Sequence, residues 1–379
     1  MIRHMADAAQ DGRHTILHLG KYYPPHPGGM ETHLRDLAIR QAVSAQVSVI
    51  VSNSTWRTDR SRDDSVSVTR LARVASIASM PVCPGFRSAI RNSPADLVHI
   101  HAPNPGAAYA FLASRHPAKL VVTHHADTIG RNFLRRFSDP VVNRMMERAS
   151  RILVTSRRYL ESSAELAPFR GKCCIVPLGI DPTIAASADP MATANLRHRF
   201  PDGFILGLGR LVSYKGFNVL IRAMKRVDKK LLLIGIGPLH EEIAKLAVSE
   251  GVANKVVMLG RVEDVRPYFA AATVFVLPSV TRAEAFGIVQ LEAMAAGIPI
   301  VNTSIDSGVP EVCVNGTTAI TVPPGDPIAL GQAIQMLLDR NDLRQRLGEA
   351  ARERVNAEFT ADLMCARTMR IYEEVLQHP

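Results

Sequence analysis

The sequence predicts an α/β protein with two doubly wound domains, each built on a parallel sheet, that face each other across a cleft. Short, β-branched apolar runs recur along the chain, and amphipathic stretches of helical length separate them. Such continuous runs are typical of strands buried on both faces, and their alternation with helices indicates parallel sheets. A chain of 379 residues is long enough for two domains of roughly 150 residues each.

Apolar runs of strand length fall in both halves of the chain, which favours two sheets over one. The expected strands are Ile16–Leu19, Val47–Val51, Val98–His101, Leu120–Thr123, Ile152–Thr155, Cys174–Pro177, Ile205–Gly209, Leu231–Gly235, Val256–Gly260, Val274–Pro278, Pro299–Asn302 and Ile320–Val322. The expected helices are Glu31–Val43, Phe217–Lys225, Leu239–Glu250 and Ile288–Ala296. Because Pro182–Pro190 has the composition of a linker, we expect domains over 1–182 and 183–356.

Positive charge is concentrated in the first half. Residues 1–180 hold 24 Lys and Arg against 13 Asp and Glu, a net charge of +11, whereas the whole chain carries +10. Such an excess favours a polyanionic partner, either nucleic acid or anionic lipid and lipid-linked phosphate, although solubility alone explains it equally well. We expect no nucleic acid, because aromatic residues make up only 5% of the chain and no recognition module is present.

The sequence predicts a cytoplasmic protein. No apolar run approaches the ~18 residues that a transmembrane helix needs. Met1–Arg13 lacks the apolar core of a signal peptide. The five cysteines have no metal-ligand spacing, so we expect reduced thiols and no zinc site.

The first candidate site runs from Gly209 to Phe217, where an expected strand ends in a glycine-bearing turn before a helix. Arg210 and Lys215 lie in this turn. Glycine allows close backbone approach, a helix N-terminus favours an anion, and the two cations add positive charge. The segment predicts a diphosphate site in preference to a solvated basic loop.

Two carboxylates eight positions apart form the second candidate. Glu284 lies in the loop after the strand that ends at Pro278, and Glu292 lies inside the next helix. A carboxylate at the carboxyl end of a parallel strand is placed to accept hydrogen bonds from sugar hydroxyls, and one further into the helix from a ribose. For Glu292 alone, a solvated helix position is the more common interpretation.

Two weaker candidates lie in the first half. Gly28 and Gly29 open a helix where backbone amides would meet a phosphate or sugar oxygen, although a plain turn explains the pair equally well. His124, His125 and Asp127 follow an expected strand, from which they would act on or orient a sugar hydroxyl. A buried structural histidine is the alternative.

The sequence contains no Asp-x-Asp. An enzyme that uses a metal to neutralise a leaving diphosphate normally needs a carboxylate cluster. The positive charge that neutralises the diphosphate would therefore come from Arg210, Lys215 and a helix N-terminus. We expect a metal-independent reaction with no metal ligands and no cofactor.

Together these motifs resemble the retaining family 4 glycosyltransferases of GT-B fold, and the likeness covers nearly the whole chain. It rests on Gly28-Gly29-Met30-Glu31-Thr32-His33, Val176–Asp181, Gly209-Arg210 with Lys215-Gly216, Gly235-Ile236-Gly237, Glu284-Ala285-Phe286-Gly287 with Glu292-Ala293, and Gly308-Val309-Pro310-Glu311. The spacing of Glu284 and Glu292 in that setting is its most specific feature.

The resemblance implies a role for each residue of the second domain. Arg210 and Lys215 would bind the donor diphosphate and stabilise its charge as it leaves. Glu284 would hydrogen-bond the transferred sugar while the backbone of Phe286-Gly287 closes around it. Glu292 would hold the ribose hydroxyls.

For the first domain, the resemblance implies that Gly28 and Gly29 approach the donor and that His125 contacts the sugar. Asp127 and His124 are further candidates for the acceptor side or for orienting the sugar. The resemblance also implies retention of anomeric configuration by front-face attack. A last helix, at about 357–379, would cross back onto the first domain.

Val280–Glu292 and Val301–Thr303 with Ser307–Pro310 look like bacterial surface-polysaccharide transferases, many of which use GDP-mannose. Ala126 stands where that group has Ser, and Ala319 where Gly is usual. The expected donor is therefore a nucleotide diphosphate sugar, with GDP-mannose preferred. The expected acceptor is a saccharide on a polyprenyl diphosphate, in exopolysaccharide or O-antigen synthesis, with the basic first domain in peripheral contact with the anionic inner leaflet.

The alternatives are a UDP-sugar-dependent transferase with a small soluble acceptor, a sugar-nucleotide epimerase and a nucleic-acid-binding protein. An epimerase needs G-x-G-x-x-G after its first strand and a Tyr-x-x-x-Lys pair. Neither occurs here.

Overall fold

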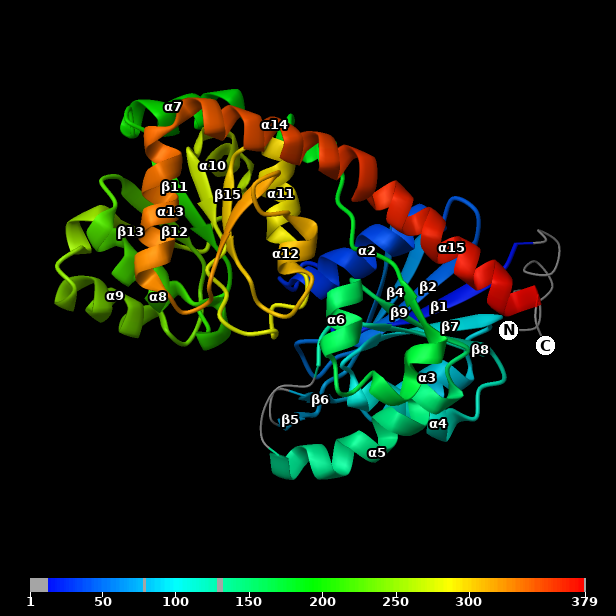
Figure 1. Ribbon diagram of the computed structural model, residues 1–379. Helices are drawn as coiled ribbons and strands as arrows, with labels where there is room; N and C mark the ends of the chain where they lie inside the picture. Colours follow the sequence, from blue (N-terminus) through cyan, green and yellow to red (C-terminus); the bar gives the residue numbers. More distant parts are fainter. Residues whose placement is uncertain (1–12, 78–79, 128–131, 378–379) are drawn as a thin grey trace. The chain divides into compact units, whose positions relative to one another are not determined.

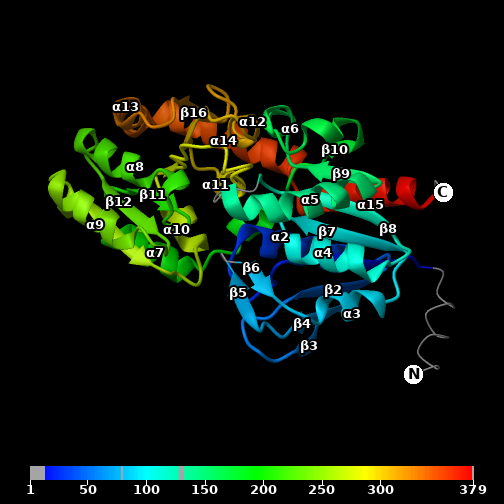
Figure 2. The same ribbon diagram turned by 90° about the horizontal axis from the view of Figure 1, so that it is seen from below.

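The computed structural model describes residues 13–77, 80–127 and 132–377. The prediction that Met1–Arg13 is not a signal peptide therefore lies outside the described residues, except for Arg13. The chain divides into two compact units (Figures 1 and 2). The first unit comprises residues 1–154, 163–176 and 364–379, and the second comprises residues 155–162 and 177–363.

The first unit contains an eight-stranded sheet in the order β10-β9-β8-β7-β1-β2-β4-β3. Its strands are β1 (Thr15–Leu19), β2 (Gln46–Ser52), β3 (Asp59–Asp63), β4 (Val66–Leu71), β7 (Leu97–Ala102), β8 (Lys119–His124), β9 (Arg151–Val154) and β10 (Cys173–Ile175). All neighbours are parallel except β3, which is antiparallel to β4. The sequence prediction missed β3 and β4. β3 is a charged, exposed edge strand without an apolar run, and polar residues interrupt the apolar residues of β4.

Helices cover both faces of this sheet (Figure 1). They are α2 (Gly29–Gln41), α3 (Phe86–Arg91), α4 (Pro105–Ser114), α5 (Asn132–Arg148), the 3-10 turn η1 (Ala167–Lys172) and α15 (Ala361–Gln377). Leu34 and Leu37 of α2 and Tyr372 of α15 belong to one core cluster with strand residues, so these two helices share a face. A short antiparallel pair, β5 (Ala75–Ile77) and β6 (Met80–Val82), lies outside the sheet.

The second unit contains a six-stranded, fully parallel sheet in the order β13-β12-β11-β14-β15-β16. Its strands are β11 (Phe204–Leu208), β12 (Lys230–Ile234), β13 (Val256–Gly260), β14 (Val274–Val276), β15 (Ile300–Thr303) and β16 (Ala319–Val322). This is the 3-2-1-4-5-6 order of doubly wound nucleotide-binding folds. The predicted α/β class with parallel sheets is confirmed.

Alternate residues of β11 enter two different cores, which explains the continuous apolar runs. Phe204 and Leu206 join one cluster, and Ile205 joins the other. One face carries α8 (Phe217–Ala223), α9 (His240–Ser249) and α13 (Pro327–Asp339), and the other carries α10 (Arg266–Ala271), α11 (Val289–Ala296) and α12 (Val309–Val312). The long helix α14 (Asn341–Glu358) contributes to both cores, with Leu343 and Leu347 in the first and Ala351 and Val355 in the second. The remaining elements are α6 (Arg157–Ser162), α7 (Pro190–Arg199), and the 3-10 turns η2 (Pro182–Ala185), η3 (Ser213–Lys215), η4 (Met224–Arg226) and η5 (Ala253–Lys255).

The boundary between the units differs from the expected residue 182. The main segment of the second unit begins at Pro177, ahead of the expected linker Pro182–Pro190, and Leu178 near its start is buried. Ile180 is buried in the core and donates its N–H to the Phe359 carbonyl, and Ala361 donates to the Ile180 carbonyl. This pairing lies at the break between α14 and α15, so the last helix begins at Ala361 rather than at about residue 357.

The short segment 155–162 also belongs to the second unit, although the sequence prediction assigned it to the first domain. The Glu311 carboxylate accepts the backbone N–H groups of Arg157 and Arg158 at 3.2 and 2.9 Å. Arg158 also pairs with Asp306 at 2.9 Å. These contacts join residues far apart in the chain, so local sequence patterns do not reveal them.

None of the described helices is both long enough and apolar enough to span a membrane.

Candidate active site

In the second unit, the predicted donor-site residues follow β11 and β14, the two neighbouring strands at which the order of strand addition reverses. From β11 the chain continues to β12 on one side, and it later returns to β14 on the other side. The crevice at the carboxyl ends of two such strands is where doubly wound sheets bind ligands. The Arg210–Lys215 turn follows β11, and the Glu284 loop follows β14.

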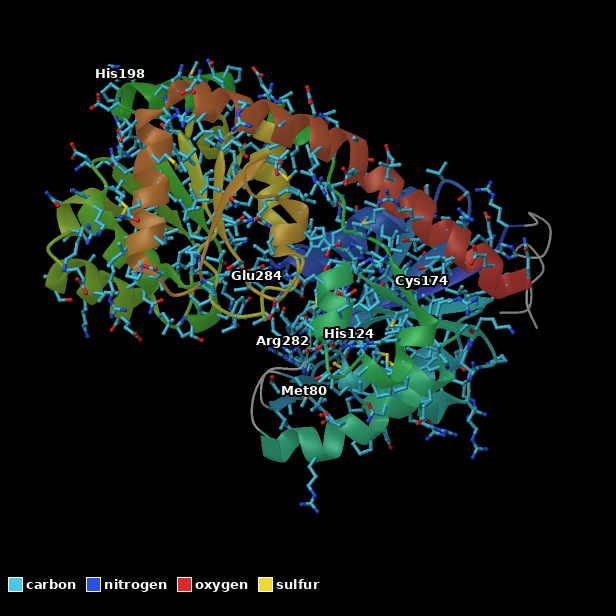
Figure 3. The ribbon with its side chains drawn as sticks, in the orientation of Figure 1. Met80, His124, Cys174, His198, Arg282 and Glu284 are labelled. Atoms are coloured by element: carbon cyan, nitrogen blue, oxygen red, sulfur yellow. The ribbon has the colours of Figure 1, made fainter. Side chains whose placement is uncertain are left out.

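Lys215 and Glu284 meet at this edge of the sheet. The Lys215 Nζ lies 2.5 Å from the Glu284 Oε2, and each side chain is only 11% exposed. Ser279 Oγ donates to the same carboxylate oxygen at 3.1 Å. Figure 3 shows Glu284 on the loop that follows β14. The chain thus holds a cation and a carboxylate together at one sheet edge.

The backbone brings the two loops together. Val280 donates its N–H to the Tyr214 carbonyl at 2.8 Å, which ties the loop after β14 to the turn after β11. Gly216 ends that turn with φ of +68°, and a Cβ there would lie 2.0 Å from the Pro278 carbonyl oxygen. Only glycine fits this close approach.

Several donors at this edge have no partner within the described residues. The exposed Arg210 side chain forms no ion pair or hydrogen bond there. The backbone N–H groups of Phe286 and Gly287, just before α11, donate no hydrogen bond to the described part of the chain. Unpaired N–H groups just before a helix favour an anionic or oxygen-rich ligand.

Glu292 lies in the first turn of α11 and is half-buried. Its carboxylate has no ion-pair or hydrogen-bond partner among the described residues. Burial raises its pKa to about 7. A half-buried carboxylate without a partner is costly, so its position favours a ligand that donates hydrogen bonds to it.

A buried amide network positions α11, and the sequence prediction did not identify it. Asn302 of β15 donates to Gln290 Oε1 at 2.9 Å, and Gln290 donates to the Phe286 carbonyl at 3.3 Å. Thr303 Oγ1 donates to the Ser279 carbonyl at 2.6 Å. Polar residues inside apolar runs were the available signal.

In the first unit, Gly28 and Gly29 stand at the start of α2. A Cβ at Gly28 would lie 2.1 Å from the Glu31 Oε2, so a side chain there would displace the buried Glu31 carboxylate. Burial raises the pKa of Glu31.

His125 follows β8 and belongs to a cluster of buried histidines that the sequence prediction missed. The other members are His18 of β1, His33 of α2, and His99 and His101 of β7. Burial lowers the pKa of His18 to about 4 and that of His33 to about 3, and it lowers the pKa values of the other three as well. All five imidazoles are therefore neutral near pH 7. The alternation of histidines in the strand His99-Ile100-His101 was the available signal.

His124 and Asp127 have partners within the first unit. His124 Nε2 lies 3.3 Å from the Glu165 Oε2, and Ser163 Oγ donates to Asp127 Oδ1 at 2.5 Å. These contacts fix the segment after β8 to the segment after α6.

Two family models match this chain. Residues 28–179 match the family model "Glycosyl transferase 4-like domain", and residues 194–354 match "Glycosyl transferases group 1". The family models and the fold show a glycosyltransferase of GT-B fold, and the chain belongs to glycosyltransferase family 4.

Three curated relatives cover most of the chain. O-antigen chain mannosyltransferase C of Escherichia coli is 28% identical over 370 residues, 96% of this chain and 99% of that protein. D-rhamnosyltransferase WbpZ of Pseudomonas aeruginosa is 30% identical over 269 residues, 70% of each. The GDP-mannose-dependent alpha-(1-6)-phosphatidylinositol monomannoside mannosyltransferase of Mycobacterium tuberculosis is 29% identical over 378 residues, 91% of this chain and 94% of that protein.

Among solved structures, sucrose-phosphate synthase from Thermosynechococcus elongatus has a TM-score of 0.81 at 22% identity, covering 97% of this chain and 100% of that one. Anabaena Alr3699/HepE in complex with UDP has a TM-score of 0.76 at 20% identity, covering 95% and 100%. At these identities the likeness shows the fold alone.

Proposed function

We propose that this glycosyltransferase moves a mannosyl group from GDP-mannose onto a lipid-linked oligosaccharide, with retention of configuration and without a metal at the leaving diphosphate. The observation that carries the proposal is the Lys215–Glu284 pair at the carboxyl ends of β11 and β14, beside an unpaired Arg210. The mannosyl and O-antigen assignments are supported by the names of the E. coli and M. tuberculosis relatives.

In this mechanism the donor diphosphate replaces Glu284 as the partner of Lys215. Lys215 and Arg210 then offset the negative charge that grows as the diphosphate leaves. Glu284, released from the pair, accepts hydrogen bonds from the hydroxyls of the sugar, and the free N–H groups of Phe286 and Gly287 donate to its oxygens. No residue is assigned as a covalent nucleophile, which favours front-face attack by the acceptor hydroxyl.

Glu292 would hold the ribose. Two ribose hydroxyls would donate to its partnerless carboxylate and stabilise the ionised form, which burial alone disfavours. From the first unit, Gly28 and Gly29 would approach the donor and His125 would contact the sugar.

Thermal unfolding with GDP, UDP, ADP and their mannose or glucose conjugates, with and without EDTA, tests the donor. A nucleotide at ~100 times its Kd adds about 2.7 kcal/mol of stability. We expect a GDP-selective shift that EDTA leaves intact. Lys215→Ala should abolish it and Lys225→Ala, in an exposed pair with Glu250, should not. A UDP-selective shift would favour the UDP-sugar alternative, and no shift with any nucleotide would contradict the diphosphate site.

The anomeric configuration of the product, read by NMR, tests retention. An α-linked product from GDP-α-mannose supports it. A β-linked product would contradict it.

A basic groove supports contact of the first unit with an anionic membrane. The groove has a volume of about 710 Å³ and is lined by Arg87, Arg91, Arg115, the 65% exposed Tyr109 and apolar residues of α4 and α5. It lies at the C-terminal end of α4, at the edge of the sheet opposite to the carboxyl ends of the strands. Because ligands of such sheets bind at the carboxyl ends, the groove is not a donor site. Cations beside an apolar wall suit an anionic lipid.

Liposome flotation tests this contact. We expect stronger binding to anionic than to neutral vesicles at low salt, and loss of that preference when Arg87, Arg91 and Arg115 are changed to Glu. The matched control changes three exposed arginines of the second unit to Glu: Arg199, Arg226 and Arg261. Equal binding to both vesicles, or equal loss in the control, would contradict the proposal.

A further inference from the structure

We propose that His33, His101 and His125 form a binding site for one divalent transition metal ion of the zinc class. All three side chains are buried in the first unit. Each offers a nitrogen, and the three nitrogens lie within 4.8 Å of one another. Neutral imidazole nitrogens are the ligands that zinc and its neighbours prefer, whereas magnesium and calcium prefer oxygen.

His33 is the main evidence for a bound ligand. Both of its ring nitrogens are buried and have no hydrogen-bond partner. Its ring stands edge-on to those of His125 and His101, with centroids 4.9 and 5.6 Å apart. A buried polar side chain without a partner is rare in folded proteins and points to a bound ion or water.

His101 and His125 already have the spacing of two ligands of one ion. Nδ1 of His101 lies 3.1 Å from Nε2 of His125. With metal–nitrogen bonds of about 2.0–2.1 Å, two ligands of a tetrahedral ion lie roughly 3.3 Å apart. The pair therefore needs little rearrangement to share a metal.

A chain of hydrogen bonds directs the lone pair of His101 toward the site. His18 Nε2 lies 2.7 Å from Gln41 Oε1, which only accepts, so His18 is protonated on Nε2. His18 Nδ1 must then accept from His101 Nε2 at 3.1 Å. The Nδ1 of His101 is left unprotonated, as a metal ligand requires.

Metal binding requires only a change of tautomer at His125 and releases no proton from the three histidines. Without metal, His125 Nε2–H donates to His101 Nδ1. With metal, the His125 proton moves to Nδ1, so both Nε2 of His125 and Nδ1 of His101 present lone pairs. His125 stays neutral, and its Nδ1–H remains for a ligand beyond the strand end.

The two other groups of possible ligands in the described residues are occupied by protein contacts. In the group of His18, His99 and His101, His99 uses both nitrogens on Thr123 and Tyr372, and His18 uses both on His101 and Gln41. In the group of His124, Asp127 and Glu165, His124 pairs with Glu165 and Asp127 accepts from Ser163. Of the three groups found in the described part of the chain, only the one containing His33 has buried ring nitrogens without a hydrogen-bond partner.

A cobalt titration of the EDTA-treated, desalted full chain tests the site independently of glycosyl transfer. We expect one equivalent of Co²⁺ to bind with the intense visible absorption of tetrahedral coordination, and one equivalent of Zn²⁺, but not excess Mg²⁺, to displace it. His33→Phe should abolish binding. His18→Phe, which removes the group behind His101, should weaken it roughly 10- to 100-fold.

His198→Ala and His240→Ala are the controls, because both histidines are exposed in the second unit (His198 is labelled in Figure 3). Both should bind as the natural chain does. If circular dichroism shows that His33→Phe does not fold, His125→Asn is tested in its place. No stoichiometric binding, an octahedral spectrum, displacement by Mg²⁺, or unchanged binding in the ligand variant would each overturn the proposal.

Discussion

The ammonium of Lys215 and the carboxylate of Glu284 lie 2.5 Å apart at the edge of the second sheet, with each side chain 11% exposed. The Lys225–Glu250 pair has nearly the same separation, 2.6 Å, but its side chains are 55% and 21% exposed. The chain thus provides a largely buried Lys–Glu pair and a more exposed one within a single domain.

Removing one member of the buried pair should destabilise the protein and abolish donor binding. We expect Lys215→Ala to lower the free energy of unfolding by about 3 kcal/mol, because it leaves a buried carboxylate without its cation. The double variant Lys215→Met/Glu284→Gln should recover much of that loss. Urea unfolding measures both. Lys225→Ala is the matched control and should have a small effect; an equal loss there would mean that burial of the Lys215 pair is unimportant.

Glu292 should make stability depend on pH. Its pKa of about 7 in the folded chain lies above its ordinary value of 4.5, so folding favours the protonated form. The resulting stabilisation is complete below pH 4.5 and is lost as the pH rises through 7. Glu292→Gln should therefore stabilise the protein above pH 7 by about 2 kcal/mol, and it should weaken nucleotide binding.

Thermal unfolding at pH 5 and pH 8, with and without nucleotide, measures both effects of Glu292→Gln. The exposed Glu241→Gln should change neither. A gain of equal size at both pH values would show that the carboxylate is not the cause.

Gly287→Ala should cost more stability than Gly251→Ala, although both glycines have φ near +70°. A Cβ at Gly251 meets nothing within 4 Å, so only the backbone strain of about 1 kcal/mol applies. At Gly287 it would also lie 2.8 Å from Leu277 and 2.9 Å from Gln290. We expect a total of about 3 kcal/mol and weaker donor binding. Equal unfolding midpoints in urea would contradict the close packing.

Tyr372→Phe should loosen α15. The Tyr372 hydroxyl is hydrogen-bonded to Nδ1 of the buried His99 on β7. Loss of the hydroxyl leaves that nitrogen without its partner, at a cost of about 1–3 kcal/mol. Hydrogen exchange of α15 should quicken in this variant. Tyr268→Phe is the control, because the Tyr268 hydroxyl has no hydrogen bond within the described residues; faster exchange of α15 there would remove the support for this contact.

The strands of the two large sheets were predictable where they form apolar runs, because a strand buried on both faces needs apolar side chains at every position. The edge strand β3 was not, since its charged residues Asp59–Asp63 face solvent. Among the residues of the candidate site, Lys215 and Glu284 were identified from their places after strands. Ser279, Gln290 and Asn302 were missed, because their hydrogen bonds join loops and strands that are distant in sequence.

The sequence by itself determined the α/β class, the parallel sheets and the loops that carry Arg210, Lys215, Glu284 and Glu292. These follow from local periodicity and from turns at strand ends, which act over a few residues. The order of the strands decided the rest. Because β11 lies beside β14, Lys215 meets Glu284, and because β1 lies beside β7, His18 meets His101. Such pairings depend on how the chain crosses over in space, and only the tertiary structure settles that.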